Sequence, residues 1–287
     1  MKEYQRILIM DVGSTKADCA FIDKVGDNIV RFASGGLNAL AADDGKVNLF
    51  LNETASSIPQ NMQPDSVFFY GAGCSTPKIC HDLEAKIASR FDCDKVYVES
   101  DLLGATRSLL GNSAGIACIL GTGSNSCLYN GSQIIDQVPS LGYVLGDEGG
   151  GVALGKRLLG DYFKRMLPSD LHIEFNEEYH LAIADVLENV YRNNTPGKFI
   201  ASFVPFIKRH ESLHYMKNML QEEFTRFFVR NVGGYEDSHH YPICFTGGVA
   251  YNFGDQLREV ANNLHYSIAK ISNRPMDDLI SFHFNKD

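Results

Sequence analysis

Two stretches decide the fold: Ile7-Leu8-Ile9-Met10-Asp11-Val12-Gly13-Ser14-Thr15-Lys16 and Ala117-Cys118-Ile119-Leu120-Gly121-Thr122-Gly123-Ser124-Asn125. Each is an apolar run that enters a turn of small residues, called here the first turn (residues 11–16) and the second turn (residues 121–125). They align without a gap at an offset of roughly 110 residues, far beyond the period of solenoid repeats. The chain is therefore predicted to contain a duplicated domain.

Each turn is followed by another short apolar run, Cys19–Ile22 or Cys127–Tyr129, which predicts two β-hairpins. Gly13 and Gly123 lack a Cβ, so backbone amides near them could closely approach phosphate oxygens. One such turn alone is more often an ordinary hairpin. Because it recurs with its neighbours in register, we expect the two tips to grip a polyphosphate across an interdomain cleft.

Length, charge and cysteine content exclude several classes of protein. The 287 residues suffice for one large domain or two ordinary ones. A net charge of −9 without a basic run argues against nucleic acid and anionic membranes as partners. No signal-like or membrane-length apolar run is present, so a cytoplasmic location is predicted. The seven cysteines are scattered without a CxxC pair, which indicates reduced core residues.

Strand and helix patterns alternate, which predicts an α/β fold with a mostly parallel sheet under helices. The first domain is expected over residues 1–114 and the second over 115–272, with a helical insertion over about 152–235. In the first half, strands are predicted at 66–70 and 95–99, and helices at 47–58, 76–90 and 101–110. In the second half, helices with breaks at Pro168, 193–197 and near Glu211 precede a strand at 241–246, a helix at 249–264 and a last short helix.

The first turn has the residues that phosphoryl transfer requires, namely groups that hold the polyphosphate and a cation. Ser14, Thr15 and, in the second turn, Ser124 add hydroxyl donors, and Lys16 could place a cation near phosphates. Asp11 ends its strand and is suited to hold Mg²⁺ directly or through water.

Asp101 is the candidate general base, because it lies where a strand ends and a helix begins. If it faces the cleft, it can accept the proton of an attacking hydroxyl. The alternative is structural: Asp101 is the helix N-cap, or Ser100 is the cap and Asp101 only offsets the helix dipole.

Two glycine-rich segments of the second half also leave alternatives open. Asp147 and Glu148 could simply be solvated, or Asp147 could bind sugar hydroxyls or help hold the metal. Gly247-Gly248, between a strand and a helix, could let a flat base approach the backbone or could be only a tight turn.

With these motifs in order, the chain resembles the acetate and sugar kinase, Hsp70 and actin superfamily, and within it the N-acetylglucosamine kinase branch grouped with ATPase activators of reductases and dehydratases. The resemblance implies two ribonuclease H-like domains, ATP and Mg²⁺ as cofactors, Asp11 linked to Mg²⁺, Asp101 as base, and a last helix over about 273–287 packed on the first domain. Implied ATP-binding residues are Gly13, Ser14, Thr15, Lys16, Gly121, Thr122, Gly123, Ser124, Gly247 and Gly248. Implied sugar-binding residues are Asn38, Gly73, Asn125 and Asp147.

The function implied is an ATP-dependent kinase acting on a hydroxyl of an amino sugar, N-acetylglucosamine or a related hexose. One departure is that Ser140-Leu141-Gly142 replaces the Gly-Gly-Trp-Gly of many relatives, so an aromatic sugar platform is missing there. Two alternatives stay open: an ATPase activator of a partner protein, which carries a cysteine-bound iron–sulfur cluster, and a non-catalytic sugar or nucleotide sensor. The aromatic-rich helices after residue 152 could form a homodimer face, and core packing explains them equally well.

Overall fold

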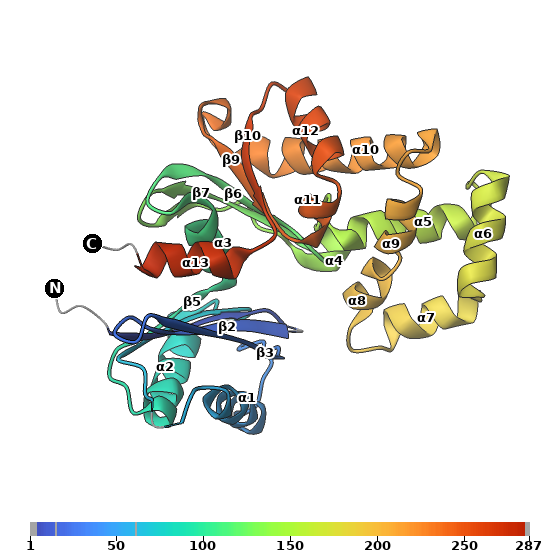
Figure 1. Cartoon of the computed structure of the whole chain (residues 1–287). Helices are drawn as coiled ribbons and strands as arrows, with labels where there is room; N and C mark the ends of the chain where they lie inside the picture. The colour runs from blue at the N-terminus through green and yellow to red at the C-terminus, as the bar shows by residue number, and fades with distance from the viewer. Residues whose placement is uncertain (1–4, 15, 61, 285–287) are drawn as a thin grey trace. The chain divides into compact units, whose positions relative to one another are not determined.

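The computed structural model describes residues 5–14, 16–60 and 62–284 (Figure 1). The chain divides into two compact units. The first unit contains residues up to Gly111 together with the segment from Arg274 onward, and the second unit is Asn112–Asn273. Each unit is built around one five-stranded sheet.

The two sheets have the same topology. Their strand orders are β3-β2-β1-β4-β5 and, read in the matching direction, β8-β7-β6-β9-β10. In both, the first three strands of the unit pair antiparallel, and the first strand also pairs in parallel with the fourth, which pairs in parallel with the fifth. The strands are β1 (Arg6–Val12), β2 (Lys16–Asp23), β3 (Asn28–Gly35), β4 (Ser66–Gly71), β5 (Val96–Ser100), β6 (Ala114–Leu120), β7 (Ser124–Asn130), β8 (Ile134–Asp136), β9 (Ile243–Thr246) and β10 (Ile268–Ser272). The predicted α/β class and its duplication are confirmed.

The expectation of a mostly parallel sheet is wrong, since both sheets are mixed. Three strands had no clear sequence signal: β3, β8 and β10. Strand β3 has no buried residue, so its side chains show little of the apolar alternation that marks a half-buried strand.

The first unit packs helices on both faces of its sheet (Figure 1). Leu8, Met10 and Val12 of β1 point into a core shared with α1 (Asp44–Ser56) and α2 (Pro77–Phe91). Ile7 and Ile9 point the other way, to a core shared with α13 (Pro275–Phe284). This division follows from the strand period of two. Helix α3 (Asp101–Leu110) packs on α13 on that second face.

Capping signals in the sequence correctly located two helix starts. Thr76 caps α2, with Oγ1 accepting from the Ile79 amide, and Pro77 occupies the first helical position. Ser100 caps α3, with Oγ accepting from the Leu103 amide at 3.2 Å.

The second unit adds a helical segment between β8 and β9 that breaks at the three predicted places, Pro168, 193–197 and near Glu211. It also breaks at 180–182 and 202–203, where no break was predicted. The unit's large core is rich in phenylalanine, including Phe175, Phe206, Phe224 and Phe228. The predicted single helix at 249–264 is two helices, separated at Phe253. The helices are α4 (Gly142–Leu145), α5 (Gly151–Phe163), α6 (Ser169–Tyr179), α7 (Ile183–Tyr191), α8 (Pro196–Ala201), α9 (Val204–Arg209), α10 (His214–Arg230), α11 (Gly248–Asn252) and α12 (Gly254–Asn263), with 3₁₀ turns at Val232–Gly234 and Ser238–His240.

All seven cysteines are free, and all but the half-buried Cys80 are buried, as the apolar context predicted. Within residues 5–14, 16–60 and 62–284, no helix combines the length and the apolar character needed to cross a membrane.

Candidate functional site

In the first unit, acidic residues gather where parallel strands end. Strands β1, β4 and β5 run in parallel, and Val12, Gly71 and Ser100 are in register. Asp11 precedes this row by one residue, and Asp101 follows it by one. The carboxyl ends of parallel strands meet at one edge of the sheet, so the two predicted carboxylates lie close enough to repel each other.

A third carboxylate, Asp18, was missed by the sequence interpretation. It pairs directly across the hairpin with Asp11, and its side chain lies 3.3 Å from Lys16 Nζ. Burial raises the pKa of Asp11 from 3.8 to about 7, with smaller contributions from Asp18 and Asp101 and an opposing one from Lys16. The signal that could have found Asp18 is that it is the one charged residue in the otherwise apolar run 17–22 of β2.

Asp11, Asp18 and Asp101 suit Mg²⁺ better than a metal ion whose ligands are all protein side chains. In the described part of the chain, no group of three or more His, Cys, Asp or Glu side chains is placed to hold an ion. Mg²⁺ is commonly bound through one or two carboxylates, water and substrate phosphates. The electrostatic cost of ionising Asp11 is also what a nearby divalent cation would remove.

Asp101 is the first residue of α3, with Ser100 as the cap, as one structural alternative foresaw. Its Oδ1 accepts a hydrogen bond from the Leu102 amide at 2.8 Å. Burial raises the pKa of Asp101, and its hydrogen bonds with backbone amides oppose the rise. These contacts hold the carboxyl group and leave it more basic than an exposed aspartate.

The first turn lies beside two predicted sugar-binding residues. Asn38 Nδ2 lies 3.4 Å from Ser14 Oγ, and the Leu37 amide donates to the Gly13 carbonyl at 3.0 Å. Gly73 has a φ of +80°, and a Cβ there would lie 2.2 Å from Asn38 Oδ1. Gly73 is thus the residue that lets this loop pack against Asn38. Thr15 lies outside the described residues.

The second turn is built differently from the first. Val12 pairs with Ala17 across the first hairpin, whereas Leu120 pairs with Ser124 across the second, so the second connection is one residue shorter. The Gly121 amide closes it by donating to the Gly123 carbonyl at 3.0 Å.

Several hydrogen-bond donors at the tip of the second turn have no acceptor among the described residues. Among the described residues, the amides of Thr122 and Gly123 make no hydrogen bond. Ser124 Oγ is buried and likewise has no partner there. Unused amides and a buried hydroxyl at one tip are the groups that bind phosphate oxygens.

The segment 146–151, called here the glycine loop, holds this second turn. Asp147 Oδ1 accepts from the Ser124 amide at 2.9 Å, and the Gly151 amide donates to the Gly121 carbonyl at 2.8 Å. A Cβ on Gly150 would lie 2.6 Å from the Gly123 carbonyl oxygen. Burial raises the pKa of Asp147, opposed by the Ser124 hydrogen bond and by Lys156.

Gly247 approaches the second turn as well. It has a φ of +107°, and a Cβ there would lie 2.4 Å from the Leu120 carbonyl oxygen. Gly248 begins α11 with open space beside it. The Asn125 side chain is bonded within the second unit: its Oδ1 accepts from the Ser126 amide and from Gln137 Nε2. The second unit therefore brings three predicted segments together: the second turn, the glycine loop and the start of α11.

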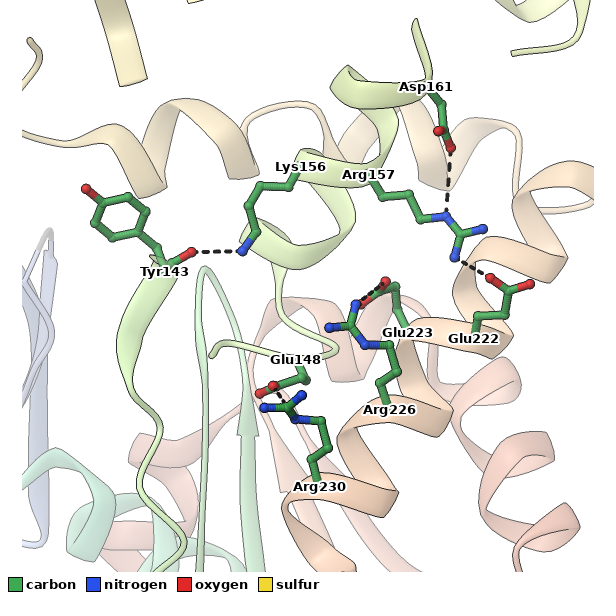
Figure 2. Close-up of polar contacts among 9 residues, drawn as sticks. All are labelled: Tyr143, Glu148, Lys156, Arg157, Asp161, Glu222, Glu223, Arg226 and Arg230. Atoms are coloured by element: carbon green, nitrogen blue, oxygen red, sulfur yellow. Dashed lines mark hydrogen bonds and ion pairs between the residues drawn. The ribbon is translucent and has the colours of Figure 1, made fainter. Parts of the chain in front are cut away.

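Several charged residues around the glycine loop were not singled out from the sequence (Figure 2). Glu148 is not solvated, which was one interpretation of its sequence: it is buried, and its Oε1 lies 2.7 Å from Arg230 Nε of α10. Lys156 Nζ donates to the Tyr143 carbonyl at 2.8 Å and so ties α5 to α4. No local pattern marks these pairs, because their partners lie far apart in the chain or bind through backbone atoms.

No family model and no curated protein matches the chain. A solved structure of a proposed N-acetylglucosamine kinase from Porphyromonas gingivalis is 39% identical, with a TM-score of 0.88 over 98% of this chain and 99% of that one. A second proposed N-acetylglucosamine kinase, from Chromobacterium violaceum, is 14% identical with a TM-score of 0.76 over 97% and 99%.

A more distant structure, the ROK family glucokinase from Streptomyces griseus solved with glucose and AMPPNP, is 14% identical. Its TM-score is 0.57 over 97% of this chain and 98% of that one. The two structures at 14% identity share the fold, whereas the Porphyromonas gingivalis structure shares both fold and sequence over nearly its whole length. The chain therefore belongs to the N-acetylglucosamine kinase-like family.

Proposed function

We propose that the chain is an ATP-dependent sugar kinase that transfers the γ-phosphoryl group to a hydroxyl of an amino sugar, N-acetylglucosamine or a related hexose. The observation that carries this proposal is the second turn, whose unused amides and buried Ser124 hydroxyl are held in place by the glycine loop. The carboxylates at the edge of the first sheet add a candidate ligand for Mg²⁺, Asp11, and a candidate general base, Asp101. Membership of a kinase-like family agrees with both.

The nucleotide is assigned to both turns. The amides of Thr122 and Gly123 with Ser124 Oγ are assigned to phosphate oxygens. Gly13, Ser14, Thr15 and Lys16 of the first turn are also assigned to the nucleotide. Preorganised amides stabilise the charge of the transferring group without reorganising during the reaction. Gly247 and Gly248 are assigned to the adenosine, because Gly248 leaves open space at the start of α11.

Asp11 is assigned to Mg²⁺, directly or through water. The bound ion would neutralise charge on the phosphate oxygens. Asp11 must be ionised to do this, and the cation would favour that ionised form. Asp18, directly across the hairpin, is placed to reinforce the same charge.

Asp101 is assigned as the general base. Its raised pKa makes the carboxylate a better proton acceptor near neutral pH than an exposed aspartate. It would accept the proton of the sugar hydroxyl as that oxygen attacks the γ-phosphorus. Asn38, Gly73, Asn125 and Asp147 are assigned to the sugar, and the contact between Asn38 and Ser14 links one of them to the first turn.

The test combines a substrate panel with one variant. ATP, Mg²⁺ and a series of hexoses and amino sugars are incubated with the protein, and ADP release is measured. Asp101→Asn should lower kcat about 100-fold or more while nucleotide affinity stays near that of the wild type. The matched control is Asp92→Asn, an exposed helix C-cap in the left-handed region that asparagine also adopts readily. Wild-type turnover in Asp101→Asn would remove Asp101 as the base.

The activator alternative has no comparable support. Such activators hold the cluster through cysteines, and here no cysteine lies between Cys127 of the second hairpin and Cys244. Iron in the purified protein, with ATP hydrolysis independent of sugar, would favour that alternative instead.

A further inference from the structure

The Glu148–Arg230 ion pair fastens the glycine loop to helix α10 (Figure 2). The Glu148 side chain is only 7% exposed, and its Oε1 lies 2.7 Å from Arg230 Nε. A buried carboxylate that loses its cation is left uncompensated, so such a pair resists separation. Gly149 makes a second contact with the same helix, because a Cβ there would lie 3.0 Å from Cβ of Phe227.

The other side of the glycine loop is bonded to the second turn. Asp147, the neighbour of Glu148, accepts a hydrogen bond at Oδ1 from the Ser124 amide (2.9 Å). The first two amides of α5 also donate to the turn: Gly151 to the Gly121 carbonyl (2.8 Å) and Val152 to the Thr122 carbonyl (2.8 Å). The loop is therefore a bridge between α10 and the turn, and these bonds set which amides of the turn remain unused.

Glu148 and Asp147 are adjacent in a tightly bent backbone. Asp147 and Gly149 both have positive φ, of +62° and +69°, and the Gly150 amide donates to the Asp147 carbonyl at 3.1 Å. A shift of Glu148 is therefore passed to Asp147, whose carboxylate fixes the Ser124 amide.

We infer that Arg230 is a positioning residue for the nucleotide: through Glu148 it fixes the glycine loop, and the loop fixes the second turn in the shape that binds phosphate. The inference rests on the proposed function. Donors are effective when the surrounding shell holds them in place, so loosening this support weakens binding without removing any phosphate contact.

The test compares Arg230→Gln with the matched control Arg226→Gln. Arg226 lies on the same helix and pairs with a carboxylate of similar burial, Glu223, at 2.9 Å, but that partner lies on α10 itself. Titration calorimetry with ADP and Mg²⁺ should show affinity about tenfold weaker in Arg230→Gln. The control should stay within about twofold of the wild type, and Arg230→Lys should recover most of the lost affinity. In the kinetic assay the KM for ATP should rise in Arg230→Gln and stay near the wild-type value in Arg226→Gln.

A second readout works without any substrate. Hydrogen–deuterium exchange of peptides covering the second turn and the glycine loop should be faster in Arg230→Gln than in Arg226→Gln. If the single variant does not fold, Glu148→Gln/Arg230→Gln, which leaves no unpaired charge, replaces it in both measurements. Equal exchange and equal ADP affinity in variant and control would overturn the inference. A wild-type protein that binds no ADP would instead overturn the proposed function, and the exchange comparison would still decide the positioning claim.

Discussion

Replacing Asp11 with asparagine should stabilise the ligand-free protein at pH 8. The ordinary pKa of 3.8 is raised to about 7 in the folded state, so folding favours the protonated carboxyl group. The unfolded chain loses that proton near pH 4, whereas the folded protein retains it until about pH 7. Wild-type stability contributed by Asp11 therefore falls as pH rises through this window and is lowest above it.

The magnitude follows from the same shift. Each pH unit corresponds to about 1.4 kcal/mol, which gives an upper limit of about 4 kcal/mol for the penalty at pH 8. The carboxyl group is partly exposed, and water screens it, so we expect Asp11→Asn to gain about 1–3 kcal/mol at pH 8. At pH 4 the gain should fall to below about 1 kcal/mol, because the folded carboxyl group is then neutral and the unfolded one is only about half ionised.

The assay is urea unfolding of wild type and variant without nucleotide, at pH values from 4 to 8. The control is Asp27→Asn, at an exposed turn position with a φ of +46° that asparagine accepts as readily as aspartate. A variant that is less stable than the wild type at pH 8, or that keeps the wild-type pH dependence, would refute the account of the Asp11 environment.

Three other substitutions test the packing around the site by urea unfolding. Gly150→Ala should cost about 1–3 kcal/mol, because its Cβ would meet the backbone of Gly123, and a cost below that of an ordinary surface change would show that the turn yields freely. Gly160→Ala, within helix α5 and with open space beside it, should instead gain up to about 1 kcal/mol. Leu141→Asn should gain about 1 kcal/mol, since Leu141 is exposed with a φ of +57°, and a loss would mean that its side chain makes a needed contact.

Local signals in the sequence predicted much of the fold. The two hairpins, the Thr76-Pro77 helix start and the proline breaks of the second unit depend on residues close together in the chain. The β3 edge strand escaped detection because it buries none of its side chains. The break at Phe253 escaped because the apolar spacing continues through it, with Val249, Leu257 and Val260 all buried.

The candidate site was predicted in part. The turns, Asp11 and Asp101 carry recognisable motifs, and the topology shared by the two sheets supports the duplication that first drew attention to the turns. Asp18 depends on hairpin register, which the sequence did not specify to the residue. The Glu148–Arg230 pair joins residues on a loop and a distant helix, and no local periodicity encodes such a contact.

The measurement that tests the account most directly is ³¹P NMR of ATP, Mg²⁺ and N-acetylglucosamine incubated with the protein. The account predicts that the γ-phosphate signal of ATP is replaced by a sugar phosphate monoester, formed one-to-one with ADP. Inorganic phosphate without any monoester, across N-acetylglucosamine and the related amino sugars, would contradict it.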